Sequence, residues 1–332
     1  MSSRYHDLNS HLRARFGVRV QKISVDAGFS CPNRDGTLGT GGCAYCNARG
    51  SGTGAHARGL SVSQQIEAGK TAMTRRYKAR RFIAYFQAFS NTHAPVDRLR
   101  AVYREALGVD GVVGLSIGTR PDCVGEPVLE LLQELARERL IWLEIGLQSA
   151  CDRTLERIGR GHDAACFLRA VAAAHARGLP VCAHVILGLP GEGPADMRRT
   201  AETLAGAAID GVKLHQLYVV RGTRLETLYR RGELRCLAQD EYVAAAVDFL
   251  ERLPATAVVQ RLTGDPQPEE LVAPAWSLDK AGTLSRLQAE LERRDTFQGR
   301  LCAPAAPALA LNFTGSRPIT GPDPRTPNGT RP

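Results

Sequence analysis

The sequence contains no long hydrophobic run. None of its apolar stretches approaches the roughly 18 to 20 residues that a membrane-spanning helix needs, and the N-terminal segment MSSRYHDLNSHLRARFG lacks the apolar core of a secretory signal. We therefore expect a cytoplasmic protein without membrane contact. With 332 residues, 43% of them hydrophobic, the chain is long enough for one large globular domain or two small ones.

Two further absences reduce the number of possible folds and of possible roles for the cysteines. No export signal accompanies the nine cysteines, which argues against a disulfide framework and favours reduced thiols, a metal site or catalysis. The chain also lacks the GxGxxG turn that would favour a doubly wound, dinucleotide-binding sheet.

Lysine is scarce, and the positive charge is unevenly distributed. The chain has 5 lysines against 38 arginines and a net charge of +9. Residues 1–81 hold 14 Lys and Arg against 4 Asp and Glu, whereas the other 251 residues hold 29 against 30. This asymmetry indicates an anionic partner, either nucleic acid or a phosphorylated or carboxylated small molecule. A soluble, arginine-rich surface without such a partner is the alternative.

Apolar, β-rich runs alternate with amphipathic helical segments along most of the chain. The predicted strands are 18–25, 82–86, 112–117, 140–147, 181–189 and 212–219, and the clearest helices are 126–138, 152–158, 165–176 and 195–208. Six strand–helix units in a row predict an α/β fold whose parallel sheet forms a partial (β/α)6 TIM-like barrel.

The pattern changes after residue 230. Helices are predicted over 240–253 and 280–294, with a further strand over 256–262. From residue 303 the chain has seven prolines in thirty residues, which is typical of a disordered tail. We therefore divide the chain into four parts: an N-terminal helical segment (1–17), the barrel core (18–235), a small C-terminal α/β extension that closes the barrel (236–302) and the Pro-rich tail (303–332).

Three cysteines lie in a glycine-rich loop directly after the first predicted strand. Cys31, Cys43 and Cys46 have the spacing C-x11-C-x2-C, and the glycines between them let the backbone turn tightly around one ion or cluster. Three cysteines suit an iron–sulfur cluster with one iron open for a cosubstrate. A tetrahedral zinc site would need a fourth ligand, here His11 or His56. Inert buried thiols are a third interpretation, which fits a polar glycine loop poorly.

The string KISVDAGFSCPNRDGTLGTGGCAYC, followed by repeated strand–helix units, resembles the radical S-adenosylmethionine (radical SAM) superfamily. It looks like a bacterial branch with a widened cysteine motif, related to the branches of the Elongator catalytic subunit and of oxygen-independent coproporphyrinogen oxidase. The motif departs from the common C-x3-C-x2-C spacing by an eight-residue insertion, which that branch is expected to have. The resemblance implies an enzyme whose [4Fe-4S] cluster, held by Cys31, Cys43 and Cys46, cleaves S-adenosylmethionine and generates a 5′-deoxyadenosyl radical.

The resemblance also implies a cofactor site at the carboxyl ends of the strands, where the active site of a barrel lies. Tyr45 would pack near the adenine or the cluster. Arg160 would pair with the methionine carboxylate, although an exposed helix-end arginine is the alternative. Where the superfamily usually has a Gly-Gly-Glu-like segment, this chain offers no carboxylate. The remaining implied cofactor contacts are Gln87, Asn91, Thr119, Arg120, Glu144, Gln148, Ile186 and Gly188.

The basic segment RRYKARR carries the predicted substrate contacts Arg75, Arg76, Lys78, Arg80 and Arg81. Together with nearby arginines it could form a phosphate-binding surface near the barrel mouth, and a solvated helix face is the alternative. His215 and Tyr218, at the end of a predicted strand, would also face the substrate, although a lone histidine is more often structural.

Because relatives of the Elongator catalytic subunit act on tRNA, the resemblance predicts RNA modification, with a one-electron donor such as flavodoxin or ferredoxin. Two alternatives stay open. One is a radical SAM enzyme that acts on an anionic small molecule or cofactor precursor. The other is a non-catalytic, zinc-stabilised nucleic-acid-binding protein, although the chain contains no OB-fold or RNP motif.

Overall fold

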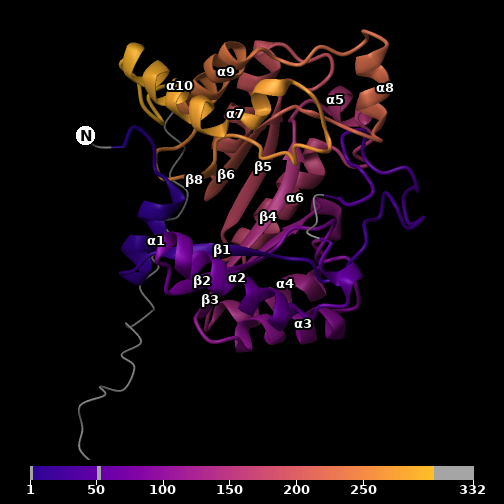
Figure 1. Ribbon diagram of the computed structural model, residues 1–332, viewed down its shortest axis with the longest axis vertical. Coiled ribbons are helices and arrows are strands. Elements are labelled where there is room, and N and C mark those ends of the chain that lie inside the picture. The colour runs from indigo at the N-terminus through magenta and orange to yellow at the C-terminus, as the bar shows by residue number, and fades with distance from the viewer. Residues whose placement is uncertain (1–2, 51–53, 303–332) are drawn as a thin grey trace, which may run out of the picture.

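The computed structural model describes residues 3–50 and 54–302 (Figure 1). The predicted Pro-rich tail, 303–332, lies outside the described residues. Within the described ranges, no helix is both long enough and apolar enough to cross a membrane.

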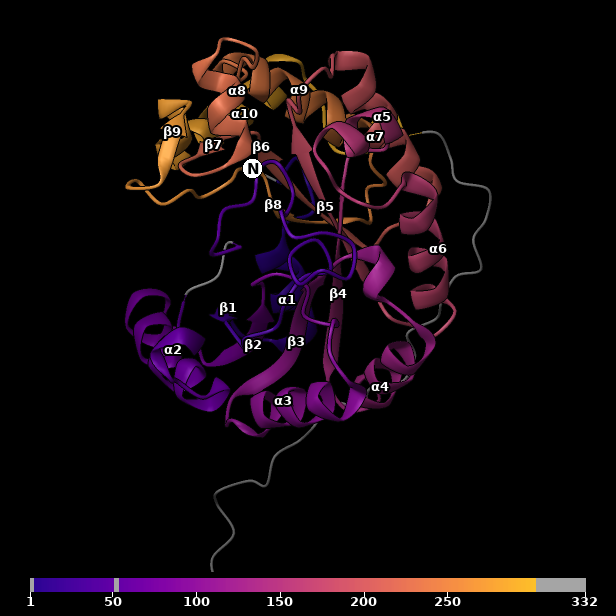
Figure 2. The same ribbon diagram turned by 90° about the vertical axis from the view of Figure 1, so that its right-hand side faces the viewer.

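A curved sheet of seven parallel strands forms the centre of the fold. In spatial order its strands are β1 (Val20–Val25), β2 (Arg81–Phe86), β3 (Val112–Thr119), β4 (Leu140–Gln148), β5 (Val181–Leu187), β6 (Gly211–Gln216) and β8 (Val258–Arg261). Figure 2 shows the sheet as an open half-barrel with helices around its convex side. The predicted α/β partial barrel is therefore confirmed.

The helices bury the outward-facing residues of the strands. They are α2 (Val62–Tyr77), α3 (Val96–Gly108), α4 (Glu126–Ala136), α5 (Asp152–Arg157), α6 (Ala164–His175), α7 (Pro194–Gly206), α8 (Arg224–Arg230), α9 (Gln239–Arg252) and α10 (Lys280–Arg293). Leu129 and Leu132 of α4 share one apolar core with Leu143 and Ile145 of β4. Because side chains alternate along a strand, the intervening residues of β4 face the lumen of the half-barrel.

A separate apolar cluster closes the amino-terminal end of the barrel. Helix α1 (Leu8–Phe16) is capped by Asp7, whose carboxylate accepts a 3.0 Å hydrogen bond from the amide of Ser10. Its Leu12 packs with Trp142 and with Val258, the first residue of β8. The lumen is therefore sealed below, and its polar side chains lie above this cluster.

The predicted strand 212–219 is divided in the structure. Strand β6 ends at Gln216, and the short strand β7 (Val219–Val220) pairs antiparallel with β9 (Leu271–Ala273) in a second sheet. Leu217 and Val219 are buried in an apolar cluster separate from the main core, so the hydrophobic run continues although the barrel strand does not. The strand predicted over 256–262 is β8, which joins the barrel sheet beside β6.

Candidate active site

The loop after β1 carries the three predicted cluster ligands. Cys31 and Cys43 are buried, Cys46 is half-buried, and all three are free thiols. The amide of Cys46 donates to the carbonyl oxygen of Cys43 at 3.0 Å, which closes a tight turn between them. Gly42 has a left-handed φ of 68°, and a Cβ atom there would lie 2.8 Å from Nη2 of Arg34. Only glycine fits this position without displacing the neighbouring arginine.

Two buried side chains donate hydrogen bonds to the thiol of Cys43. Nδ2 of Asn33 lies 3.4 Å from Cys43 Sγ, and Nη1 of Arg160 lies 3.6 Å from it. Burial by itself raises the pKa of this thiol, but the charge and hydrogen bond of Arg160, and then Asn33, bring it below its usual value. The environment thus favours the thiolate, which is the metal-binding form of cysteine.

The donor set of this loop suits an iron–sulfur cluster. Three cysteines supply the thiolates, and Asn33 and Arg160 supply the hydrogen bonds to sulfur that tune such clusters. Across residues 3–50 and 54–302, no three His, Cys, Asp or Glu side chains stand close enough together to hold one metal ion. The fit therefore rests on the chemistry of the donors and not on ligands that already converge.

Arg160 reaches the cysteine loop from the segment between α5 and α6. Its Nη2 donates to the carbonyl oxygen of Gly146 on β4 at 2.8 Å, and its side chain is buried. The alternative of an exposed helix-end arginine is therefore wrong. A Cβ atom at Gly146 would lie 2.6 Å from Nη2 of Arg160, so the glycine lets the guanidinium lie against the strand. Nε of Arg160 is buried and has no partner among the described residues.

Thr119 and Arg120, at the end of β3, are already bonded to their neighbours. The Thr119 hydroxyl oxygen lies 2.6 Å from that of Thr92. Arg120 forms a two-pronged ion pair with Asp122, with distances of 2.9 and 2.7 Å, and donates Nη1 to the carbonyl oxygen of Arg160 at 2.8 Å. These bonds hold the end of β3 against the residue that contacts Cys43. If either side chain contacts the cofactor directly, it has to give up one of these hydrogen bonds or ion pairs.

The other predicted cofactor residues near this end of the barrel are Tyr45, Gln87, Asn91, Gln148, Ile186 and Gly188. Tyr45 and Ile186 pack against the same small apolar cluster. Gln148 ends β4 with a φ of 75°, a conformation that L side chains adopt rarely. Asn91 donates Nδ2 to the carbonyl oxygen of Gly118 at 2.8 Å, while its buried Oδ1 has no partner among the described residues.

Glu144 lies deeper in the lumen, where both of its carboxylate oxygens are bonded. Oε1 accepts from Nζ of Lys22 at 2.5 Å, and Oε2 accepts from Nζ of Lys213 and from Nε2 of His184, the latter at 2.7 Å. Burial raises the pKa of this carboxyl, but the charges of Lys213 and Lys22 and the His184 bond bring it well below its usual range. A cofactor contact by Glu144, as the resemblance implies, would have to displace one of these partners.

Sequence reasoning missed the cationic partners of Glu144. Lys22 on β1 and Lys213 on β6 occupy inward positions, and Nζ of Lys213 lies 3.8 Å from the ring centroid of Tyr85 on β2. A lysine between apolar residues of a strand is the signal that identifies such a position, because a buried ammonium needs a partner.

The two lumen histidines are neutral in this environment. The rings of His184 and His215 lie 6.2 Å apart, centroid to centroid. Burial and then the charge of Lys213 lower the pKa of His184 to about 4. Burial and then the charge of Arg261 bring the pKa of His215 well below its usual value.

We expect the free energy of unfolding to fall as the pH decreases from 6.5 to 5. In this range the unfolded chain protonates His184 whereas the folded chain does not, so stability declines by up to about 1.4 kcal/mol per pH unit for this histidine. Urea unfolding at several pH values measures this slope. His184→Gln should make it shallower, with the remainder due to His215, and His56→Gln, at an exposed position, should leave it unchanged. Equal slopes in all three proteins would contradict the assignment.

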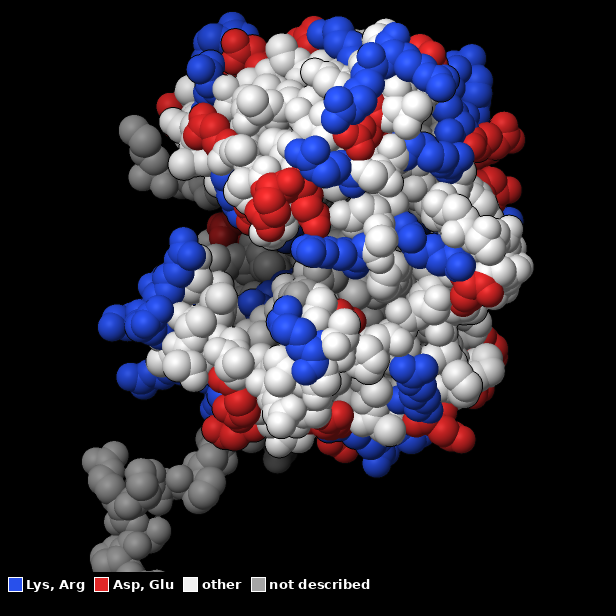
Figure 3. Space-filling view, turned by 45° about the vertical axis from the view of Figure 1, so that its right-hand side comes forward, with Lys and Arg blue, Asp and Glu red and all other residues white. Residues whose placement is uncertain are grey.

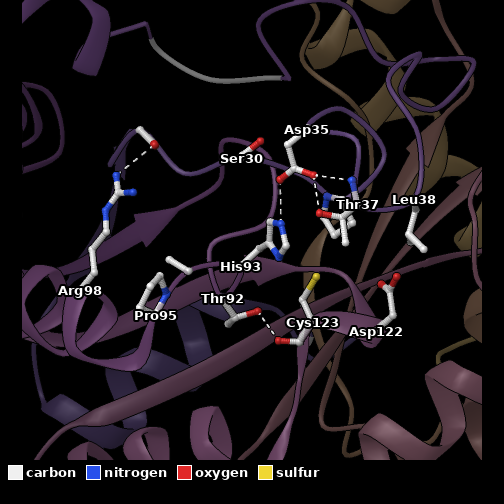
Figure 4. Close-up of a pocket in the computed structure, with 13 residues that line it drawn as sticks. Ser30, Asp35, Thr37, Leu38, Thr92, His93, Pro95, Arg98, Asp122 and Cys123 are labelled. Atoms are coloured by element: carbon white, nitrogen blue, oxygen red, sulfur yellow. Dashed lines mark hydrogen bonds and ion pairs between the residues drawn. The ribbon is translucent and has the colours of Figure 1, made fainter.

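A cavity of about 650 Å³ lies beside the cysteine loop (Figure 4). The figure shows His93 pointing to Asp35, and their Nε2 and Oδ2 atoms are 2.8 Å apart. The Cys123 thiol also lines this cavity, and burial raises the pKa of that thiol to about 11. Nothing in the spacing of these residues along the sequence singles out this cavity.

The five predicted substrate contacts of the basic segment are exposed, but they do not lie at the barrel mouth. Arg75 and Arg76 lie in the last turn of α2, and Arg81 begins β2. This segment therefore lies at the amino end of the strand, roughly 17 Å from its carboxyl end. Helix α2 packs against the edge strand β1. Figure 3 shows Lys and Arg side chains on the lower lip of a hollow at the left of the view.

His215 and Tyr218 lie closer to the predicted active site. His215 is on β6 next to His184, and Tyr218 follows β6 directly. Burial raises the pKa of Tyr218, and Cys46 is among the charged groups that affect it. The structure thus places these two residues apart from the basic segment.

Comparisons with known proteins agree with this geometry. The model of the radical SAM superfamily matches residues 36–204, and that of the radical SAM C-terminal domain matches residues 209–293. YtqA of Bacillus subtilis is 43% identical over 297 residues, which are 90% of this chain and 92% of that protein. A tRNA uridine(34) acetyltransferase of Methanocaldococcus jannaschii is 28% identical over 155 residues, which are 45% of this chain and 28% of that protein.

A solved structure shares the fold. The Elp3 protein of Methanocaldococcus infernus, lacking residues 1–46, superposes with a TM-score of 0.65 at 16% sequence identity. The match covers 84% of this chain and 64% of that one, so this chain spans less than two thirds of that structure. The chain therefore belongs to the radical SAM superfamily, as its cysteine loop and strand pattern predict, and it is a radical SAM enzyme that uses a [4Fe-4S] cluster and S-adenosylmethionine.

Proposed function

We propose that this radical SAM enzyme modifies tRNA in the cytoplasm. The observation that carries the proposal is the exposed basic segment at the end of α2, which presents five cations beside the open edge of the half-barrel. Its charge and exposure suit a phosphate backbone. The partial similarity to a tRNA uridine(34) acetyltransferase supports the same class of substrate.

In this proposal Cys31, Cys43 and Cys46 hold the cluster. When bound, the cluster and S-adenosylmethionine supply one-electron bond cleavage and hydrogen abstraction. Asn33 and Arg160 keep Cys43 in its thiolate form through the bonds described above. Nε–H of Arg160, the buried donor without a partner among the described residues, is the group that we assign to the methionine carboxylate.

The barrel orients the reaction and limits the access of water. The apolar cluster of Leu12, Trp142 and Val258 closes the amino end of the lumen, so a substrate group enters from the carboxyl side, where the cysteine loop lies. Gln148 and Ile186, at that side, are assigned to the ribose and the adenine. A flavodoxin or ferredoxin would deliver the electron.

The basic segment would hold the body of the RNA away from the reacting atoms. A rigid tRNA is larger than the roughly 17 Å that separates the two ends of β2, so contact at the amino end and chemistry at the carboxyl end are compatible. Replacement of the positive charges of this segment should therefore weaken RNA binding. It should not change the cleavage of S-adenosylmethionine in the absence of RNA.

Salt-dependent tRNA binding tests the proposal. We expect the combined variant Arg75→Gln, Arg76→Gln, Arg80→Gln and Arg81→Gln to reduce the slope of log affinity against log salt by about 3, because each lost phosphate contact removes roughly 0.7 to 0.9. The matched control replaces four exposed arginines that are paired with acids, Arg230, Arg235, Arg286 and Arg293, and should retain the slope. Equal slopes for both variants, or no salt-dependent binding by the wild type, would contradict tRNA as the substrate.

A further inference from the structure

A layer of polar side chains crosses the lumen between the apolar cluster below and the cysteine loop above. Five strands contribute to it: Lys22 from β1, Tyr85 from β2, Glu144 from β4, His184 from β5 and Lys213 from β6. Arg261 at the end of β8 is the register partner of Lys213. Register partners of neighbouring strands project to the same face of the sheet, so the Arg261 side chain lies with Lys213 toward the lumen. After burial, its charge is the next cause of the lowered pKa of His215.

The charges of this layer do not balance. Lys22, Lys213 and Arg261 carry three positive charges, and Glu144 supplies one negative charge. Both oxygens of Glu144 are already engaged by Lys22, Lys213 and His184. The side chain of Arg261 forms no hydrogen bond or ion pair with any residue of the described ranges. Buried or half-buried cations in excess of their partners are costly unless an anion joins them.

Small inward residues and one further nitrogen lie beside this layer. The next inward residues toward the carboxyl ends are Ser24 on β1, Gly118 on β3 and Gly146 on β4. All three are small: Ser24 is the register partner of Tyr85, Gly118 is that of Glu144, and Gly146 lies against the guanidinium of Arg160. His215, one inward position above Lys213, adds a further nitrogen next to His184.

We propose that Arg261, Lys213 and His215 form an oxyanion subsite in the lumen, which binds a carboxylate or phosphate group carried by the substrate. The guanidinium of Arg261 offers a two-pronged contact to either group. Lys213 offers the two N–H bonds that it does not give to Glu144. Glu144 has the role of a positioning residue, because it holds Lys213 and His184 in place below the subsite.

This subsite specifies which part of the substrate enters the barrel, and it rests on the proposed function only for the claim that tRNA carries the anionic group. The oxyanion itself could belong to a modified nucleobase of tRNA or to a free small molecule. The chemistry of recognition is the same for both sources, and the experiment below separates them.

Binding of inorganic phosphate and of acetate to the full-length, anaerobically reconstituted protein with S-adenosylmethionine tests the subsite. Ligand-observed NMR should show one saturable site per chain for at least one of the two anions. Arg261→Gln should weaken this binding by about 10- to 100-fold, since a hydrogen-bonded charge is lost. Arg261→Lys keeps the charge, so its affinity for the anion should lie between that of Arg261→Gln and that of the wild type. The control Arg235→Gln, at an exposed position, should bind as the wild type does.

The same titration in the variant without Arg75, Arg76, Arg80 and Arg81 removes competing surface contacts and should give the same affinity. Displacement of the bound anion by tRNA would support both the subsite and the proposed function. Anion binding that depends on Arg261 but resists tRNA would support the subsite and contradict tRNA as its source, in favour of a free anionic molecule. Absence of saturable binding of both anions, or unchanged binding by a folded Arg261→Gln protein, would overturn the subsite regardless of whether tRNA binds.

Discussion

Replacement of Cys43 by serine is expected to reduce formation of 5′-deoxyadenosine from S-adenosylmethionine by at least about 10³-fold, to the background level. Cys43 is the one cysteine of the loop whose thiol accepts hydrogen bonds from both Asn33 and Arg160. A serine hydroxyl keeps the size of the side chain but does not ionise at neutral pH, so it cannot replace the thiolate. The assay follows deoxyadenosine by chromatography after addition of dithionite and S-adenosylmethionine.

The matched control is Cys166→Ser. Cys166 is half-buried on α6, where its backbone amide binds the side chain of Asp163 and its thiol takes no part in the cysteine loop. This variant should keep wild-type iron content and activity. A Cys43→Ser protein that retained both iron and deoxyadenosine formation, or an equal loss in the two variants, would contradict the assignment of Cys43 as a ligand.

Replacement of Glu144 by glutamine is expected to destabilise the protein by about 3 to 5 kcal/mol. Glutamine has nearly the same shape, so the loss arises from charge and not from packing. It leaves Lys213, which is only 2% exposed, and Lys22 without a counter-ion. Denaturant unfolding measures the difference. A variant as stable as the wild type would show that this carboxylate does not hold the lumen together.

The pH dependence of this difference has a definite sign. Because the pKa of Glu144 is lowered in the folded state, its stabilising contribution is present above the unfolded value of about 4.3 and is lost as the pH falls through the folded pKa. The difference in the free energy of unfolding between the wild type and Glu144→Gln should therefore be largest at pH 7 and decrease at acidic pH. Glu134→Gln, which removes a half-buried surface carboxylate paired with Arg100 and Arg104, should leave the melting temperature nearly unchanged.

The strands were the most predictable part of the fold, and particular residues explain where prediction fails. The apolar residues over 140–147 are buried on both faces of β4. A continuous apolar run of this kind can be recognised in a sequence as a strand of a parallel sheet. Leu217 and Val219 are equally apolar, but they are buried in a second cluster outside the barrel. The hydrophobicity of a residue predicts that it is buried, but it does not predict in which of the two apolar clusters the residue packs.

The residues of the candidate site can be predicted where the spacing of residues along the chain identifies the chemistry. The cysteine loop has such a spacing, and the structure places Arg160 beside it. The pairing of Arg160 with the methionine carboxylate, which the resemblance implies, stays a prediction. The partners of Glu144 come from strands far away in the sequence, so only the register of the sheet brings Lys22 and Lys213 to it. The predicted place of the basic segment near the barrel mouth is wrong, because a segment that directly precedes a strand lies at the amino end of that strand.

Anaerobic reconstitution of the wild-type protein with iron and sulfide tests the central claim most directly. We expect a brown protein with about four irons per chain, an EPR signal after reduction that changes when S-adenosylmethionine is added, and formation of 5′-deoxyadenosine. Stoichiometric zinc in a colourless protein, with no cluster and no deoxyadenosine, would contradict it and would favour a zinc-stabilised binding protein instead.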